Sequence, residues 1–154
     1  MEELIRGRKF IAVIGGSTCP GEILELAEQV GEEIAKFNGI LVCGGLGGVM
    51  EASCRGAKSF GGVTIGILPG DDPADANPFV DIPIATGMGI SRNQIIIKSS
   101  NAAVAIDGKY GTLSEICFCL QLNVPVIGLR TWDIEGVIPS DTAKEAVRKA
   151  FELA

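Results

Sequence analysis

The sequence of 154 residues contains no histidine. This absence excludes every mechanism that depends on an imidazole, including a Ser-His-Asp triad, a Cys-His dyad and the zinc site of an H-E-x-x-H helix. Any catalysis by this chain must therefore use carboxylates, lysine, arginine, tyrosine, serine or cysteine. Both charge types are present, since 19 residues are Asp or Glu and 13 are Lys or Arg.

Long apolar runs and an excess of positive charge are also missing. Although 47% of the residues are hydrophobic, no uninterrupted apolar run reaches the ~18 residues that a membrane-spanning helix needs. The net charge of −6 disfavours nucleic acid as a partner, because binding its phosphates requires a cationic field. Residues 1–8 are charged and show no signal peptide, so we expect a cytoplasmic protein that does not bind a membrane.

Familiar metal and cofactor motifs are absent as well. The five cysteines include no C-x-x-C pair, and we interpret all five as small buried hydrophobic side chains. No G-x-x-x-x-G-K-[ST] sequence occurs, which disfavours a P-loop ATPase. The acidic residues of loop 71–75 do not have the spacing of an EF-hand, so we expect a solvated loop there, no metal site and no resident cofactor.

Short apolar runs alternate with helical patterns along the whole chain. The runs predicted as strands are 10–16, 40–43, 63–68, 81–85, 102–106 and 126–129, and the predicted helices are 20–37, 49–59, 92–99, 112–123 and 141–153. This alternation predicts a single α/β domain over residues 1–154, with a mostly parallel, doubly wound sheet and helices on both faces.

Three glycine-rich turns follow predicted strands, at residues 15–17, 44–48 and 108–111. The carboxyl ends of parallel strands meet at one edge of a sheet, where ligands of such folds bind. Backbone N–H groups at a helix start suit a phosphate there. The sequence therefore predicts a site for a small phosphorylated ligand, although turn 44–48 fits a tight packing turn equally well.

Two charged side chains near these turns each have two interpretations. Thr112 and Glu115 fit the S/T-x-x-E capping box, in which Glu115 only returns a hydrogen bond to the cap residue. Alternatively, Glu115 faces the ligand as a base or electrostatic stabiliser, since a helix start favours a charged carboxylate. Arg92 lies at a predicted helix start, which favours either an anionic partner or exposure to solvent.

Three segments together resemble a known family. Gly-Gly-Leu-Gly-Gly-Val-Met at 44–50, Gly-Ile-Ser-Arg-Asn at 89–93 and Gly-Thr-Leu-Ser-Glu at 111–115 are similar to the Rossmann-like group of the "lonely guy" (LOG) cytokinin-activating proteins. Segment 74–87 is typical of the molybdenum cofactor carrier-like, DprA/Smf-related branch of that group. The resemblance extends from residue 11 to residue 129 and implies a Rossmann-like domain.

LOG enzymes are phosphoribohydrolases that cleave the N-glycosidic bond of nucleoside 5′-monophosphates, with the signature P-G-G-x-G-T-x-x-E and an upstream arginine. The resemblance implies that Arg92 and Glu115 form the catalytic pair if the chain is an enzyme. Asp107 replaces the signature proline and Lys109 its second glycine. The lysine decarboxylase label of many relatives finds no support, because the pyridoxal phosphate lysine of those enzymes usually follows a histidine.

The motifs and the resemblance together define the predicted ligand-binding residues. They are Gly16, Ser17, Gly44, Gly45, Gly47, Gly48, Met50, Asn93, Gly108, Lys109, Tyr110, Gly111 and Thr112. We expect a cytoplasmic binding protein for a phosphorylated nucleotide-like ligand, either of molybdopterin type or a nucleoside monophosphate, that assembles as a homodimer or larger homo-oligomer. The alternatives are a LOG-type phosphoribohydrolase and a scaffold with a degenerate site.

Overall fold

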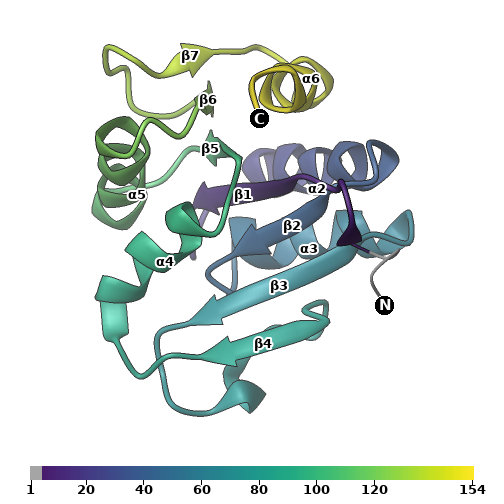
Figure 1. The fold of residues 1–154 in the computed structure, drawn as a ribbon, viewed down its shortest axis with the longest axis vertical. Coiled ribbons are helices and arrows are strands. Elements are labelled where there is room, and N and C mark those ends of the chain that lie inside the picture. The colour runs from purple at the N-terminus through teal and green to yellow at the C-terminus, as the bar shows by residue number, and fades with distance from the viewer. Residues whose placement is uncertain (1–4) are drawn as a thin grey trace.

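Seven parallel strands form the central sheet of the computed structural model, which describes residues 5–154. In chain order they are β1 (Phe10–Gly15), β2 (Ile40–Cys43), β3 (Val63–Leu68), β4 (Ile82–Ala85), β5 (Ala102–Ile106), β6 (Val126–Leu129) and β7 (Ile138–Pro139). Their order across the sheet is β4-β3-β2-β1-β5-β6-β7 (Figure 1). The chain therefore starts in the middle and winds outward in both directions, which confirms the predicted Rossmann-like, doubly wound fold.

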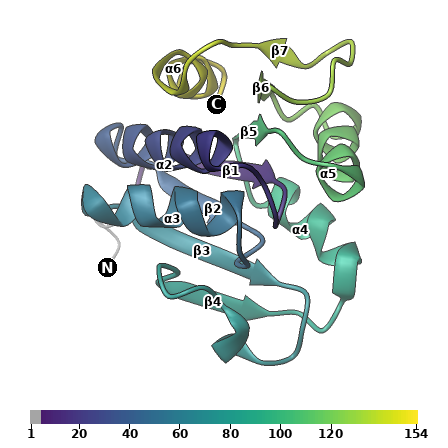
Figure 2. The same cartoon turned by 180° about the vertical axis from the view of Figure 1, so that it is seen from behind.

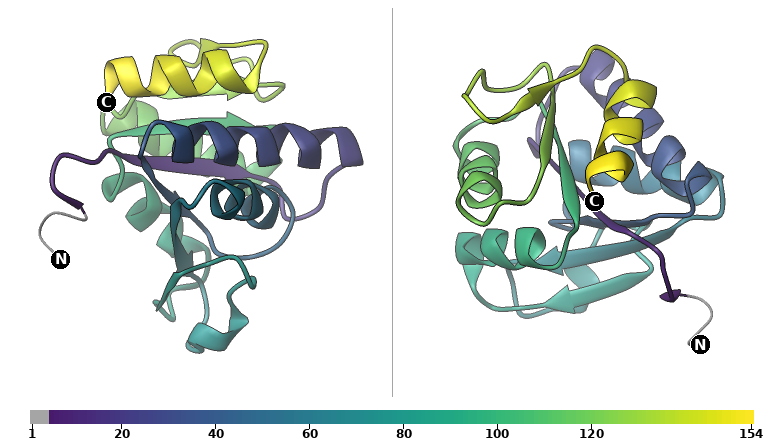
Figure 3. Two further views of the ribbon diagram at one scale, coloured as in Figure 1. Left: turned by 90° about the vertical axis from the view of Figure 1, so that its right-hand side faces the viewer. Right: turned by 45° about the horizontal axis from the view of Figure 1, so that its top comes forward.

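Helices cover both faces of the sheet. One face carries α2 (Gly21–Lys36), α3 (Val49–Ser59) and α6 (Ala143–Leu153), and the other carries α4 (Asn93–Lys98) and α5 (Tyr110–Gln121) (Figures 2 and 3). Short 3-10 turns occur at η1 (Pro73–Asp75) and η2 (Gly89–Arg92). Within the described residues, no helix combines the length and apolarity needed to cross a membrane.

The apolar runs are continuous because the inner strands are covered on both sides. In β1, Ile11 and Val13 pack in the core beneath α2, α3 and α6, whereas Ala12 and Ile14 pack in the core beneath α4 and α5. All five residues of β5 are likewise buried. Two hydrophobic cores, one on each face, therefore stabilise the same sheet.

The structure departs from the predicted elements at several places. The two-residue strand β7 was not predicted, because it is too short to show a period and one of its residues is proline. The helix predicted at 112–123 begins two residues earlier, at Tyr110, and the one predicted at 92–99 is α4, preceded by η2. The cysteine interpretation is wrong for Cys117, which is exposed because it lies on the outer face of α5, and for Cys19, which is only partly buried in the turn after β1.

The backbones of α2 and α3 approach each other at two glycines. A Cβ atom added to Gly31 would lie 1.9 Å from the carbonyl oxygen of Ser53, and one added to Gly56 would lie 1.9 Å from that of Glu28. Neither position has space for a methyl group. These two glycines therefore set the separation of the helices, and α3 carries Met50, which reaches the site described below.

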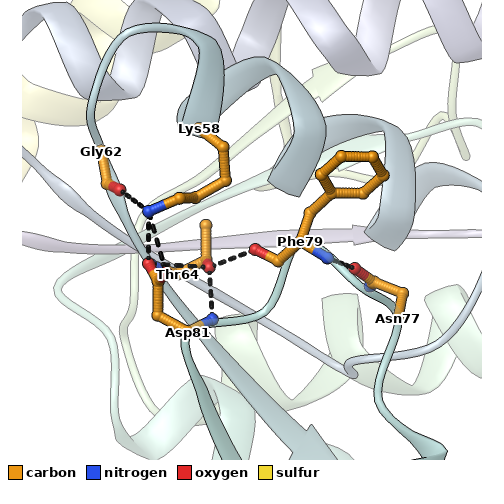
Figure 4. Close-up of polar contacts among 6 residues, drawn as sticks. All are labelled: Lys58, Gly62, Thr64, Asn77, Phe79 and Asp81. Carbon is orange, nitrogen blue, oxygen red and sulfur yellow. Dashed lines mark hydrogen bonds and ion pairs between the residues drawn. The ribbon is translucent and has the colours of Figure 1, made fainter.

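A polar network joins the outer strands to the end of α3 (Figure 4). The Lys58 ammonium lies 2.8 Å from Asp81 Oδ1, and Asp81 Oδ2 accepts a hydrogen bond of 3.0 Å from the Thr64 N–H. Nearby, Asn77 accepts a hydrogen bond from the Phe79 N–H and donates one of 2.9 Å to the Leu46 carbonyl. Segment 77–81 therefore supports the second glycine turn from outside.

We expect Gly56→Ala to destabilise the protein, although alanine normally favours a helix. Overpacking against the Glu28 carbonyl should lower the free energy of unfolding by about 1–3 kcal/mol, measured by urea denaturation. The control is Gly21→Ala in α2, where no atom lies within 4 Å of an added Cβ. A neutral or stabilising effect of Gly56→Ala would contradict the tight packing of the two helices.

Candidate ligand-binding site

A cavity of about 340 Å³ lies beyond the carboxyl ends of β1 and β5. These two strands are neighbours in the sheet. The chain that leaves β1 runs towards β2 on one side, and the chain that leaves β5 runs towards β6 on the other, so the cavity occupies the switch point of the sheet. Its lining residues come from the first and third glycine turns and from segments 46–50 and 90–93. They are Gly15, Gly16, Ser17, Thr18, Leu46, Met50, Ile90, Arg92, Asn93, Asp107, Gly108, Lys109, Gly111, Thr112 and Glu115.

Most of the predicted site residues come together at this cavity, but five do not line it. Those that line it are Gly16, Ser17, Met50, Arg92, Asn93, Gly108, Lys109, Gly111, Thr112 and Glu115. The five outside the lining are Gly44, Gly45, Gly47, Gly48 and Tyr110, and the Tyr110 residue is 80% exposed. Sequence reasoning left out Leu46 and Ile90, although both lie inside the motifs that carry the resemblance.

The second glycine turn supports the site through close backbone packing. A Cβ atom on Gly44 would lie 2.6 Å from Arg92 Nη2. Gly48 has a φ of 63°, and a Cβ atom there would lie 2.3 Å from the Gly16 carbonyl oxygen. This arrangement favours the packing interpretation of turn 44–48, and direct contact of its glycines with a ligand stays a prediction.

Arg92 is a buried cation rather than a solvated one. Only 8% of the residue is exposed. Its Nε donates a hydrogen bond of 2.8 Å to the Ile67 carbonyl, Nη2 donates one of 3.4 Å to the Gly44 carbonyl, and Nη1 donates to Asn93 Oδ1. Burial lowers the pKa of Arg92, while the nearby Glu115 opposes this shift.

Asn93 connects this guanidinium to the start of α5. Its Nδ2 donates a hydrogen bond of 3.0 Å to Ser114 Oγ, and Ser114 Oγ donates one of 2.6 Å to the Gly111 carbonyl. Ser114 was not among the predicted site residues, because a serine inside a helix has no sequence feature that distinguishes it. The network fixes the position of α5 relative to Arg92.

The first turn of α5 presents backbone donors beside the cavity. The N–H groups of Tyr110, Gly111 and Thr112 have no acceptor in the part of the chain that the structure describes. Lys109 is the N-cap residue and lines the cavity, but its side chain makes no capping bond. A helix start with free N–H groups and a nearby ammonium attracts an anion.

Two residues from the β6–β7 connection hold the third turn in place. Thr131 Oγ1 donates a hydrogen bond of 2.7 Å to the Asp107 carbonyl, and Trp132 Nε1 donates one of 3.1 Å to the Lys109 carbonyl. Asp107 adopts a positive φ of 50°, which Asp tolerates better than most residues. Neither Thr131 nor Trp132 was predicted, since they lie 24 and 23 residues downstream of the turn residues that they contact.

Glu115 does not form the capping box. The helix begins at Tyr110, so Glu115 lies more than one turn inside it, and only 6% of the residue is exposed. Its carboxyl has no hydrogen bond or ion pair with any residue from 5 to 154. Burial raises its pKa to about 8, although the charge of Arg92 opposes the shift. The expectation of a charged carboxylate is therefore wrong, because desolvation outweighs the helix start.

Comparison of the sequence with known proteins identifies relatives of two kinds. Residues 8–152 match the SLOG cluster4 family. A protein from Archaeoglobus fulgidus with no characterised function is 47% identical over 138 residues, which are 89% of this chain and 91% of the relative. The cytokinin riboside 5′-monophosphate phosphoribohydrolase of Mycobacterium tuberculosis is 38% identical over 119 residues, but these cover 73% of this chain and only 62% of the enzyme.

Solved structures match nearly the whole chain. The molybdenum cofactor binding protein of the phototrophic bacterium Rippkaea orientalis has a TM-score of 0.90 and 32% identity, covering 96% of this chain and 98% of that one. The molybdenum cofactor carrier protein of Chlamydomonas reinhardtii has a TM-score of 0.84 and 33% identity, covering 95% and 98%. The resemblance to the LOG group and to its carrier-like branch is thereby confirmed.

The raised pKa of Glu115 predicts how stability depends on pH. The folded chain holds this proton more tightly than the unfolded chain, whose carboxyl titrates near 4.5. The stabilising contribution is therefore complete below about pH 4.5 and is lost as the pH rises through about 8. We expect Glu115→Gln, whose amide stays neutral, to lose less unfolding free energy than the wild type over that range in urea denaturation.

The matched control is Glu135→Gln, which changes an exposed glutamate in the connection to β7. It should keep the pH profile of the wild type. Parallel profiles for the wild type and Glu115→Gln would show that Glu115 is charged in the folded protein.

Proposed function

Because the chain belongs to the SLOG cluster4 family, we propose that it binds a small phosphorylated ligand in the switch-point cavity. The ligand class is a nucleoside monophosphate or a phosphorylated pterin of molybdopterin type. The observation that carries this proposal is the set of free N–H groups at the start of α5, which opens on a cavity that Lys109 also lines.

The charges of the cavity favour an anion. Arg92 and Lys109 are cationic, and Asp107 is the one acidic lining residue besides Glu115. Since burial keeps Glu115 protonated near neutral pH, the lining carries more positive than negative charge. The phosphate would accept hydrogen bonds from the Gly111 and Thr112 N–H groups, with Lys109 as an additional ion-pair partner.

The extent of the similarities supports binding over catalysis. The molybdenum cofactor binding and carrier proteins match almost the full length of both chains. The phosphoribohydrolase match leaves more than a third of the enzyme uncovered. Asp107 and Lys109 also replace two signature residues of the hydrolases within the loop itself.

Glu115 supports a second candidate function, N-glycosidic hydrolysis of a nucleoside monophosphate. A carboxyl group that stays protonated near neutral pH can donate its proton to the departing base, as general acids of glycoside hydrolysis do. Arg92 would orient the substrate from beneath the cavity. In this role Glu115 acts as an acid, not as the base or stabiliser that the sequence suggested.

Self-association through β4 is the assembly that we propose. Among residues 5–154 this strand pairs only with β3, so its outer edge is open there. Four large apolar residues are exposed along it and the turn that follows, namely Ile82, Ile84, Met88 and Ile90. A second copy of the chain would cover this surface, which reaches the cavity at Ile90. A cytoplasmic location stays a prediction.

We expect calorimetric titration with AMP to show saturable binding without release of adenine. Lys109→Ala should weaken the affinity about tenfold, which corresponds to the loss of one charge-assisted hydrogen bond. The control Lys98→Ala removes an exposed cation at the end of α4, outside the cavity lining, and should bind like the wild type. If none of AMP, inorganic phosphate and a phosphorylated pterin binds, the binding proposal is wrong and the scaffold alternative remains.

Turnover would distinguish the hydrolase. Chromatography of a prolonged incubation with AMP should then reveal adenine and ribose 5-phosphate, at a rate that falls as the pH rises through about 8. The Glu115→Gln variant should no longer release adenine but should still bind AMP. Product formation that survives Glu115→Gln would rule out Glu115 as the acid.

The assembly proposal predicts a dimer or larger species in light scattering after size-exclusion chromatography. Ile84→Lys places a charge in the apolar strip of β4 and should shift the mass towards that of the monomer. Leu153→Lys changes a residue that is equally exposed at the end of α6 and serves as the control. A monomeric wild type would contradict the proposal.

A further inference from the structure

Two cysteines from different elements lie side by side beneath the second glycine turn. Cys43 is the last residue of β2 and Cys54 lies within α3, and their Sγ atoms are 3.5 Å apart. Both residues are completely buried. Neither has a part in the proposed binding or in the hydrolase alternative, so the pair is a nucleophilic cluster without an assigned role.

The surroundings make the two thiols unequal. Cys43 Sγ accepts a hydrogen bond of 3.3 Å from the Gly45 N–H. The hydrogen bond between the two thiols lowers the pKa of Cys43, burial opposes this, and the Gly45 N–H lowers the pKa further. The same contact with Cys43, together with burial, raises the pKa of the Cys54 thiol. Cys43 is therefore the better nucleophile, and Cys54 is the thiol that retains its proton.

The pair is directly connected to the ligand cavity. Gly44 directly follows Cys43 in the sequence. The Gly44 carbonyl accepts a hydrogen bond from Arg92, and a Cβ atom added to Gly44 would lie 2.7 Å from Met50 Sδ. Met50 and Arg92 both line the cavity. A disulfide has an S–S distance of about 2 Å, so closing the bond requires the two side chains, or the β2 and α3 backbones that carry them, to move next to this turn.

We propose that Cys43 and Cys54 are a redox modification site, at which hydrogen peroxide forms a disulfide that displaces turn 44–48 and weakens ligand binding. The effect on ligand binding rests on the proposed function, whereas disulfide formation does not. Peroxide is the oxidant class that fits, because a buried pair excludes larger disulfide reagents.

The chemistry balances in two steps. The Cys43 thiolate attacks one peroxide oxygen, the O–O bond breaks, and a sulfenic acid and one water form after proton transfer. Cys54 Sγ then attacks the Cys43 sulfur, the S–O bond breaks, and the leaving hydroxide takes the Cys54 proton as a second water. Two thiols are oxidised by two electrons, and one peroxide is reduced to two waters.

Peptide mass spectrometry tests the modification directly. Trypsin releases both cysteines in one peptide, residues 37–55, and places Cys19 in a separate peptide and Cys117 with Cys119 in a third. After treatment of the full chain with one equivalent of peroxide, the 37–55 peptide should have lost two hydrogen atoms and should resist alkylation. Dithiothreitol should restore both alkylation sites. Alkylation of both cysteines after oxidation, or sulfinic acid at Cys43, would overturn the proposal.

AMP titration of the oxidised chain tests the coupling to the cavity. We expect the affinity to fall about tenfold, equivalent to one charge-assisted hydrogen bond, and to recover on reduction. Cys54→Ala should abolish the redox dependence, and Cys117→Ala, at an exposed position, should keep it. If the reduced chain binds neither AMP, inorganic phosphate nor a phosphorylated pterin, the proposed function fails, and hydrogen exchange of residues 44–50 then decides the coupling. Equal exchange and equal affinity in both redox states would overturn it.

Discussion

The burial of one guanidinium group determines the arrangement of the candidate site. Arg92 donates hydrogen bonds to the carbonyl of Gly44, which follows β2, and to that of Ile67, which is the last residue but one of β3. It also donates to the side chain of the neighbouring Asn93. A buried cation without such acceptors would be strongly destabilising. The requirement that position 44 lack a side chain follows from this, since a Cβ atom would collide with the guanidinium.

The charge of the cavity also depends on burial, which removes water from both Arg92 and Glu115. Arg92 and Glu115 both line the cavity, yet no ion pair joins them within residues 5–154. The charge of Arg92 therefore only partly offsets the burial of Glu115, whose pKa is raised to about 8. The consequence is a cavity with a cationic lining and one neutral acid, which suits a phosphate beside a group that can donate a proton.

Much of the fold and part of the site could be predicted from local patterns. The apolar runs of β1, β2 and β5 identify strands covered on both faces, and the glycine turns after β1 and β5 line the cavity at the predicted edge of the sheet. The strand β7 could not be found, because two residues carry no periodicity. Thr131 and Trp132 were missed because their role exists only in contact with turn 107–110.

The sequence by itself determined the doubly wound sheet, the edge at which its glycine turns gather and the exclusion of histidine chemistry, because periodicity and composition are properties of the chain alone. The tertiary structure decided that Glu115 is a neutral acid, that Arg92 is buried and that Cys43 lies beside Cys54. Protonation and thiol contact depend on desolvation and on neighbours that folding brings together from distant segments. No local pattern encodes those distances.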